Sequence, residues 1–179
     1  LFDWTHTSIP NKSWVYPPNK SQWRGEGLLC KALRCHYRQG RKEMADRNAI
    51  EQLFADYGWP MDTQDWPILE SVFTEDADFA ITIPGMDRIG PINGRDAIIE
   101  FCSSTVGDQD DQRRHVITNI RIINETDTTA DVFAILSLIV VANGSLAVQS
   151  SGMYRTKVAR GVDGNWRFTS MVIELDLPF

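Results

Sequence analysis

Four long strand-like runs fill the C-terminal part of this 179-residue chain. In chain order they are "RHVITNIRIIN", "TTADVFAILSLIVVANG", "LAVQSSGMYRTKVAR" and "NWRFTSMVIELDL". The short segments between them, "NETD", "NG" and "GVDGN", are rich in residues that form hairpin turns. Consecutive strands joined by hairpins predict a long antiparallel meander, and this meander is the main constraint on the fold.

Helical patterns precede the meander. The segment "DRNAIEQLFADYGW" repeats apolar residues at helical spacing, which predicts an amphipathic helix with Asp46 as its N-cap. Gly58 and Pro60 predict the end of this helix. A second helix is expected in "TQDWPILESVF", with Pro67 in its first turn. After a strand in "DADFAITIP", the segment "GPINGRDAIIEFCSS" predicts a turn and a third helix.

Helices followed by a meander predict an α+β fold. We expect a curled antiparallel sheet whose concave face is covered by the three N-terminal helices. A curled sheet that is only partly covered leaves a pocket, where a small molecule could bind.

The charge of the chain is uneven along its length. Residues 1–43 carry eight Lys and Arg against three Asp and Glu, whereas residues 44–179 carry ten against twenty-one. The first methionine is Met44, at the start of the first helical pattern. We therefore predict a basic, Trp- and Pro-containing extension over residues 1–43 and one folded domain over residues 44–179. The extension is either disordered or non-native, or it is a tail that packs on a partner.

The composition disfavours several kinds of partner. A formal net charge of −6 argues against a nucleic-acid-binding surface, which usually needs a basic face. The longest apolar run, Val132–Ala142, is too short to cross a bilayer, so no membrane span is expected. No secretory leader opens the chain, and we expect a cytoplasmic protein.

Metal and cofactor sites are not expected either. Cys30 and Cys35, which is followed by His36, have no second ligand pair, so two incidental thiols are favoured over a metal site. Cys102 lies in a helical pattern and is expected in the core. The chain has no phosphate-binding glycine loop, and no cofactor is predicted.

His115 is the only histidine after residue 36, and it shares a strand face with Asn119. A lone histidine on a strand is more often structural or exposed than catalytic. Asp62 stands between the first two helices, where an aspartate is often an N-cap, although Thr63 could cap instead. If Asp62 lies beside His115, it would fix the imidazole tautomer and favour the protonated form, which makes a general base. Tyr57 precedes Asp62 by five residues and could supply a hydroxyl.

Taken together, these segments resemble a known family. The first helix, "YGWPMDTQDWPILESVFTEDADF", "GRDAIIEF", "RRHVITNIRI" and "GNWRF" are similar to the SnoaL-like branch of the nuclear-transport-factor-2-like (NTF2-like) superfamily. The resemblance covers Ala49–Phe179. It implies a cone-shaped α+β barrel with a deep apolar pocket.

The resemblance also implies a chemistry. In the dehydratase and dehydrochlorinase members of this branch, an Asp–His dyad abstracts a proton so that water or chloride can leave. By type and place, these residues match Asp62 and His115. A tyrosine that lies five residues before the aspartate in the bile-acid dehydratase members matches Tyr57. An assisting arginine of the dehydrochlorinases has no match, because Met171 stands in its place, and dehydrochlorination is therefore disfavoured.

We therefore expect a cofactor-independent small-molecule lyase or isomerase of the dehydratase type, with a hydrophobic substrate in a deep pocket. His115 would abstract the proton, Asp62 would orient it, and Tyr57 would hydrogen-bond the leaving or carbonyl oxygen. The other expected substrate-binding residues are Trp59, Trp66, Phe73, Phe79 and Phe101, with Asn119 and Tyr154 as weaker hydrogen-bond donors.

The competing hypothesis is a non-catalytic ligand-binding or structural module of the same fold. In that case Asp62 caps its helix, His115 makes a local hydrogen bond, and any pocket binds without turnover. The small subunits of ring-hydroxylating dioxygenases share the fold and act in this structural way. With either function, the resemblance implies a homodimer or homotrimer formed through the sheet.

Overall fold

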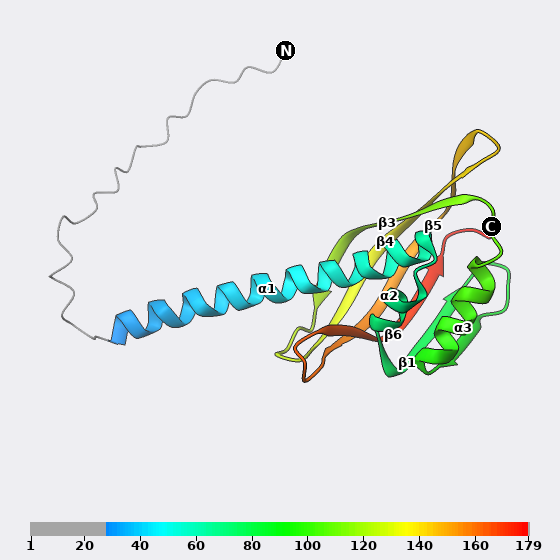
Figure 1. Cartoon of the computed structure of the whole chain (residues 1–179). Coiled ribbons are helices and arrows are strands. Elements are labelled where there is room, and N and C mark those ends of the chain that lie inside the picture. Colours follow the sequence, from blue (N-terminus) through cyan, green and yellow to red (C-terminus); the bar gives the residue numbers. More distant parts are fainter. Residues whose placement is uncertain (1–27, 179) are drawn as a thin grey trace, which may run out of the picture. The chain divides into compact units, whose positions relative to one another are not determined.

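The structure, a computed structural model, describes residues 28–178, with side chains from residue 46 on. The chain divides into two units, Leu1–Gly40 and Arg41–Phe179. The described helices are α1 (Leu28–Thr63), α2 (Trp66–Ser71) and α3 (Arg95–Val106) (Figure 1). The described strands are β1 (Phe73–Thr82), β2 (Ile89–Asn93), β3 (Gln112–Ile123), β4 (Thr129–Ala142), β5 (Ser145–Arg160) and β6 (Trp166–Leu175).

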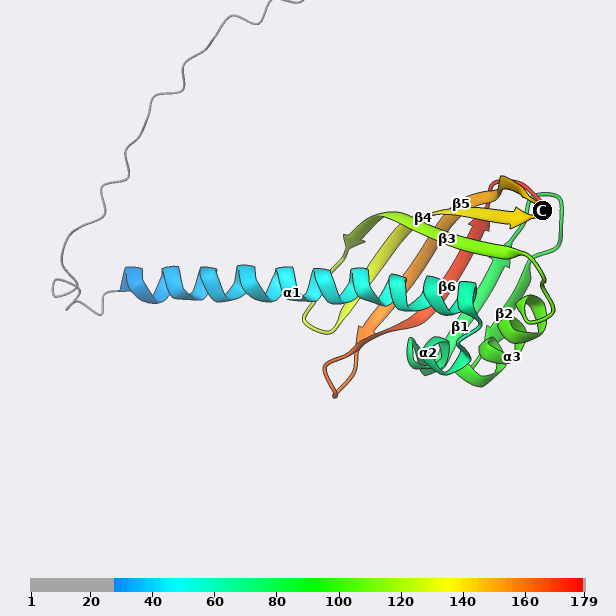
Figure 2. The same ribbon diagram turned by 45° about the horizontal axis from the view of Figure 1, so that its top comes forward.

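The strands form one six-stranded sheet in the order β2-β1-β6-β5-β4-β3. The predicted antiparallel meander is confirmed, since β3 to β6 pair with their neighbours in chain order. β6 then pairs in parallel with β1, and the segment predicted as a turn forms the short edge strand β2. All five strand pairs contain a register shift. Such irregularities increase local twist and bend, which suits the curled, unclosed sheet in Figure 2.

The hairpin between β4 and β5 follows from two residues. Asn143 and Gly144 have φ angles of 50° and 72°, so both lie in the left-handed region. This backbone matches a type I′ turn, whose twist suits adjacent antiparallel strands. The "NG" pair therefore predicted both the position and the length of this turn.

The helices lie over the concave face of the sheet (Figures 1 and 2). The core is formed by side chains of the helices and the sheet. Ile50, Leu53, Phe54 and Tyr57 of α1 are buried, as their helical spacing predicts. The rings of Phe54 and Tyr57 pack edge-on against Phe168 of β6, with centroid distances of 5.1 and 6.0 Å. This aromatic layer holds the C-terminal turns of α1 against the sheet.

α1 begins and ends at residues other than those predicted. Asp46 lies inside the helix instead of capping it, and its buried carboxylate pairs with the Arg160 guanidinium at 3.2 Å. Gly58 and Pro60 also lie inside the helix, which continues to Thr63. The burial of neighbouring residues such as Tyr57 and Met61 against the sheet outweighs the unfavourable helix propensity of Gly58 and Pro60.

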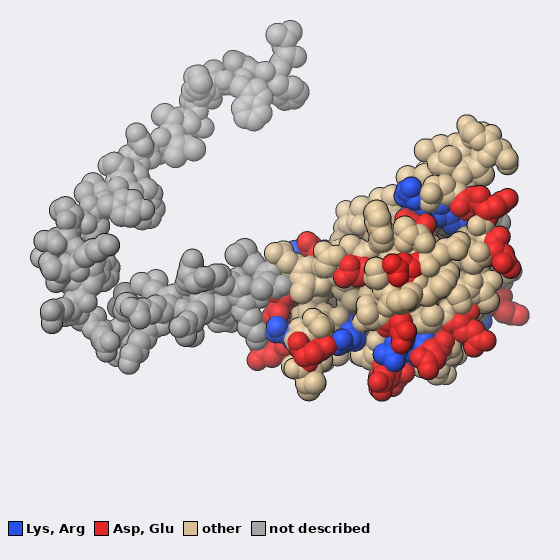
Figure 3. All heavy atoms as spheres, viewed as in Figure 1, with Lys and Arg blue, Asp and Glu red and all other residues tan. Residues whose placement is uncertain are grey.

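On the face of the molecule that Figure 3 shows, acidic side chains are spread widely, while the basic ones lie in small separate groups. This distribution agrees with the excess of Asp and Glu after residue 43. No helix within residues 28–178 is long and apolar enough to cross a membrane.

Candidate active site

Asp62 comes from the last turn of α1, where the chain turns sharply. Gln64 has a left-handed φ of 58°, and the N–H of Asp65 donates to the Pro60 carbonyl at 3.2 Å. These features are those of a Schellman C-cap, which ends the helix just after Asp62. Asp65 caps α2, accepting from the Ile68 N–H at 3.3 Å, so neither Asp62 nor Thr63 takes the N-cap role that was considered for them.

Gly58 lets α1 approach β3 closely at the level of the histidine. A Cβ atom at Gly58 would lie 3.2 Å from Cδ1 of Ile117 and 3.5 Å from Cβ of His115. The glycine therefore serves the packing of α1 on β3 rather than the end of the helix. One turn further along α1, the same approach places Asp62 beside His115.

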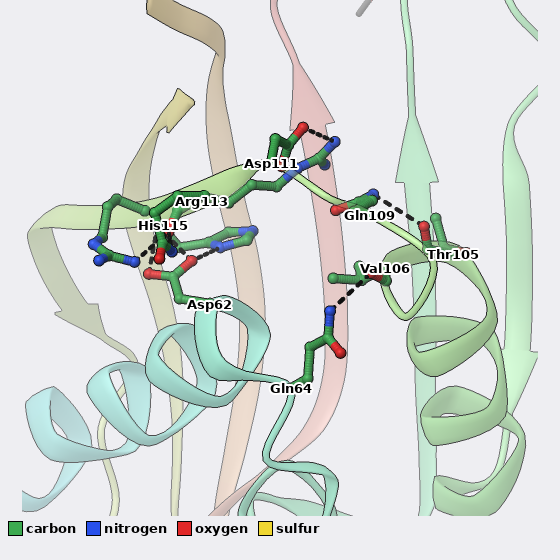
Figure 4. A network of polar contacts seen from close by, with 10 residues as sticks. Asp62, Gln64, Thr105, Val106, Gln109, Asp111, Arg113 and His115 are labelled. Carbon is green, nitrogen blue, oxygen red and sulfur yellow. Dashed lines mark hydrogen bonds and ion pairs between the residues drawn. The ribbon is translucent and has the colours of Figure 1, made fainter. Parts of the chain in front are cut away.

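Asp62 and His115 form a close pair (Figure 4). Oδ1 of Asp62 lies 2.6 Å from Nδ1 of His115, and both carboxylate oxygens accept from the His115 backbone N–H at 3.0 Å. Each side chain is only 10% exposed. Because the carboxylate binds both the ring and the backbone of the histidine, it fixes the orientation of the imidazole. With Nδ1 donating to Asp62, the lone pair of the neutral ring lies on Nε2.

His115 lines a cavity of about 280 Å³ on the concave side of the sheet. Four of the residues predicted to surround the substrate also line it: Tyr57, Phe79, Phe101 and Tyr154. The remainder of its wall comes mainly from aliphatic side chains, among them Met61, Ile81, Ile83, Ile89, Val106, Leu136, Leu138, Ile173 and Leu175. An apolar wall with few polar groups suits a hydrophobic ligand.

Four other predicted substrate-binding residues do not line this cavity. Trp59 is 69% exposed and borders a separate groove between α1 and β3, which Asp62 and His115 also line. Trp66 is half-buried at the start of α2, where it packs on the core. Helical spacing predicts which residues share a face of a helix, but it does not predict which face packs on the sheet. The positions of these two tryptophans could therefore not be predicted from the sequence.

Phe73 and Asn119 also lie outside the lining of this cavity. Phe73 is fully buried at the start of β1 and belongs to the core. Asn119 was expected on the face of His115, but the register shifts between Thr118 and Arg121, and Asn119 takes a φ of 54°. This bulge breaks the strict alternation of the strand and leaves Asn119 exposed.

The prediction missed the polar residues of the cavity wall: Thr105, Gln109, Arg113 and Gln149. Arg113 could have been found, because it lies two residues before His115 and therefore on the same face of β3. Gln109 belongs to the polar loop after α3, whose path has no periodic pattern to predict it.

Two buried tyrosines meet at the cavity. The rings of Tyr57 and Tyr154 lie 5.7 Å apart at 80°, and the Tyr154 hydroxyl has no hydrogen-bond partner among the described residues. Burial, and then the neighbouring Tyr154, raise the pKa of Tyr57 well above its ordinary value. Burial, and then the Asp62 carboxylate, raise the pKa of Tyr154. Both phenols therefore stay protonated near neutral pH and can act as hydrogen-bond donors.

Cys102 of α3 is buried as predicted, and burial raises the pKa of its thiol to about 12. At pH 8 only roughly one such thiol in ten thousand is ionised, and the thiolate is the reactive form. We expect Cys102 to resist iodoacetamide in the folded protein and to react once urea unfolds the chain. Peptide mass mapping of the two samples checks this, and equal labelling of Cys102 in both would contradict it.

Among the described side chains, no group of three or more His, Cys, Asp or Glu could hold a metal ion. The side chains of Cys30, Cys35 and His36 lie outside the described ones, so that weak metal pattern stays a prediction.

The curled, unclosed sheet and its partly apolar cavity define a protein with an α+β fold. The structure is similar to that of an NTF2-like protein with a cystatin-like fold from Novosphingobium aromaticivorans. The two share 20% sequence identity over 84% of this chain and 91% of that chain, with a TM-score of 0.63.

A family model described as the SnoaL-like domain matches residues 42–172. The chain therefore belongs to the SnoaL-like family. This result confirms the family that the sequence resembles, and with it the α+β fold class. No curated protein sequence matches the chain.

Two further solved structures are similar. A protein from Catenulispora acidiphila in complex with S-DNPA is 26% identical over 74% of this chain and 95% of that chain, with a TM-score of 0.64. A provisionally assigned scytalone dehydratase from Novosphingobium aromaticivorans is 22% identical over 77% of this chain and 89% of that chain, also with a TM-score of 0.64. At 22% identity, the second likeness establishes a shared fold alone.

Proposed function

We propose that this protein is a small-molecule lyase or isomerase of the dehydratase type, acting on a hydrophobic substrate in the cavity. The observation that carries the proposal is the 2.6 Å contact between Asp62 Oδ1 and His115 Nδ1, beside a cavity that His115 lines. A general base needs a free lone pair, a fixed orientation and access to the substrate. His115 meets the first two requirements through Asp62, and the third through its place in the cavity wall.

In the proposed reaction, the substrate is a β-hydroxy ketone. Nε2 of His115 takes the proton on the carbon next to the carbonyl, and the C–H electrons form an enolate. The enolate then forms the C=C bond as the C–O bond to the β-hydroxyl breaks. The imidazolium returns its proton to the departing hydroxide, so water and an enone are the products and the dyad is restored. Asp62 stabilises the imidazolium while it exists.

Tyr57 and Tyr154 are proposed to stabilise the enolate. Both hydroxyls are buried at the cavity, and their raised pKa values favour hydrogen-bond donation over proton loss. A ligand carbonyl oxygen that reaches the Tyr154 hydroxyl would supply the hydrogen-bond partner that this buried group lacks. Donors held at the atom where negative charge develops lower the barrier more than they improve ground-state binding.

A Tyr154→Phe substitution tests this role. We expect kcat to fall by about 10² while KM changes little, because the lost hydrogen bond matters most when the enolate forms. The thermal midpoint should stay equal or rise, since the change removes a buried hydroxyl that has no partner. Steady-state kinetics and a thermal melt measure the two effects. An unchanged kcat would contradict the assignment of Tyr154.

The general function is tested by proton exchange, which does not require the natural substrate. A panel of bicyclic ketones and β-hydroxy ketones would be incubated with the protein in D₂O. Loss of the signal from the hydrogen next to the carbonyl would be followed by NMR. We expect the protein to accelerate exchange for at least one ligand that binds the cavity. Tight binding of several such ketones without any exchange would favour the non-catalytic module instead. The Catenulispora acidiphila relative, solved with S-DNPA, supports ligand binding by the shared fold.

A further inference from the structure

One part of the cavity wall carries a hydrogen-bond acceptor with no partner. Gln109, in the loop after α3, donates from Nε2 to the Thr105 carbonyl at 3.0 Å. This contact fixes which end of the amide is which, because only the NH₂ group can donate to a carbonyl. Oε1 of Gln109 is therefore the other end, and it is buried with no hydrogen-bond partner among the described residues. A buried acceptor of this kind favours a ligand that brings a donor.

Arg113 also lines this cavity, and Figure 4 shows its guanidinium paired with Asp111. Its Nε and Nη2 donate to the two carboxylate oxygens of Asp111 at 2.9 and 3.3 Å. The Arg113 and Asp111 side chains are only 23% and 19% exposed. A guanidinium has five N–H groups, so donors remain after Asp111 is bound. Asp111 also balances the charge of Arg113, which lowers the attraction for an anionic ligand.

Arg113 and His115 leave the strand at different points, which separates this polar end of the cavity from the base. Arg113 and His115 lie on one face of β3, and no register shift separates them. Two residues along a strand span about 7 Å. The two side chains therefore leave the strand at points about 7 Å apart.

We infer that Gln109 and Arg113 bind a hydroxyl group at the end of the substrate remote from the reacting carbon. A hydroxyl can donate to Gln109 Oε1 and accept from Arg113 at once, whereas a ketone or ether can only accept and an ammonium can only donate. A carboxylate cannot donate either, and it would add a second anion beside Asp111. The substrate class is thus a neutral, largely apolar ring system with a hydroxyl at its remote end. This inference deepens the proposed function and rests on it in taking the cavity as the substrate site.

Binding of three matched probes tests the inference without any turnover. They are 4-hydroxybiphenyl, 4,4′-dihydroxybiphenyl and 4′-hydroxybiphenyl-4-carboxylic acid, with Kd measured by titration calorimetry on the full chain. One hydroxyl of each probe can hydrogen-bond to Tyr57 or Tyr154. The substituent at the other end of the probe tests the proposed hydroxyl site at Gln109 and Arg113. We expect the diol to bind at least tenfold more tightly than the mono-hydroxy probe, and the acid to bind more weakly than the diol.

Two variants test whether Gln109 causes the preference for the diol over the mono-hydroxy probe. Gln109→Leu should bring the Kd of the diol to that of the mono-hydroxy probe. Gln64→Leu is the matched control, because Gln64 also donates to a backbone carbonyl near the end of α3, that of Val106 at 3.3 Å, but does not line the cavity. The Gln64→Leu variant should keep the tenfold preference for the diol. Thermal melts of both variants verify that they are folded.

The outcomes separate this inference from the proposed function. Equal affinity for diol and mono-hydroxy probe in the natural protein, or a preference that survives Gln109→Leu, would overturn the hydroxyl site and leave the dyad untouched. Binding of none of the probes would overturn the hydroxyl site together with the hydrophobic cavity as a ligand site. A His115→Ala variant that keeps the diol preference but loses proton exchange supports both proposals independently.

Discussion

A His115→Ala variant is expected to lose 10²- to 10⁴-fold in kcat, the usual contribution of a positioned general base. The reason is geometric: His115 is the ring that Asp62 orients at 2.6 Å, and it lines the cavity in which the substrate is proposed to sit. Kd for a bound ketone should change by less than about threefold, since little apolar contact is removed. The expected loss in kcat would therefore reflect a slower proton-transfer step and not weaker binding.

The measurement is the rate of ketone proton exchange in D₂O, together with kcat once a β-hydroxy ketone substrate is found. Val116→Ala is the matched control, because Val116 is the next residue of β3 and is 39% exposed. It faces away from the side of the strand that His115 occupies. We expect it to retain nearly all activity. Equal activity of the His115→Ala variant and the natural protein would end the general-base hypothesis, whatever its effect on stability.

The meander was predictable because its signals are local. Alternating β-branched residues and the Asn143-Gly144 turn specify strands and a hairpin without knowledge of the rest of the chain. The limits of α1 were not predictable in this way. Gly58 and Pro60 predict a helix end by local propensity, but the close packing of Gly58 on β3 and the Schellman turn at Gln64 place the end later.

The candidate site likewise has features that the sequence predicted and features that depend on packing. Asp62 and His115 were paired from residue type and from the family that the sequence resembles, and the structure brings them together. The residues chosen as pocket residues for their aromatic character are divided between the cavity wall, the core and solvent. Composition cannot tell whether a ring faces the core, the cavity or solvent, and a single bulge moved Asn119 off the expected face.

Phe73 and Phe101 allow the difference between a core residue and a cavity residue to be measured, since both were predicted to bind substrate. Phe73 is fully buried, with its ring 6.2 Å from that of Tyr57 and 5.7 Å from that of Phe168. Phe73→Ala should lower the free energy of unfolding by ~3–5 kcal/mol, because it leaves a hole in a closed core. Phe101 is half-buried in the cavity wall, 5.9 Å from Phe79, and Phe101→Ala should cost less than about 2 kcal/mol.

The two variants should show the opposite order in ligand binding. Phe101→Ala removes part of the surface that contacts a ligand, so Kd for 4-hydroxybiphenyl should rise by about tenfold or more. Phe73→Ala, assayed at a temperature where it is fully folded, should change this Kd much less, because Phe73 does not line the cavity. Urea unfolding and titration calorimetry measure the two quantities. If Phe73→Ala were the variant that weakens binding while leaving the unfolding free energy intact, the boundary between core and cavity described above would be wrong. The aromatic residues near α2 would then have to be reassigned to the ligand site.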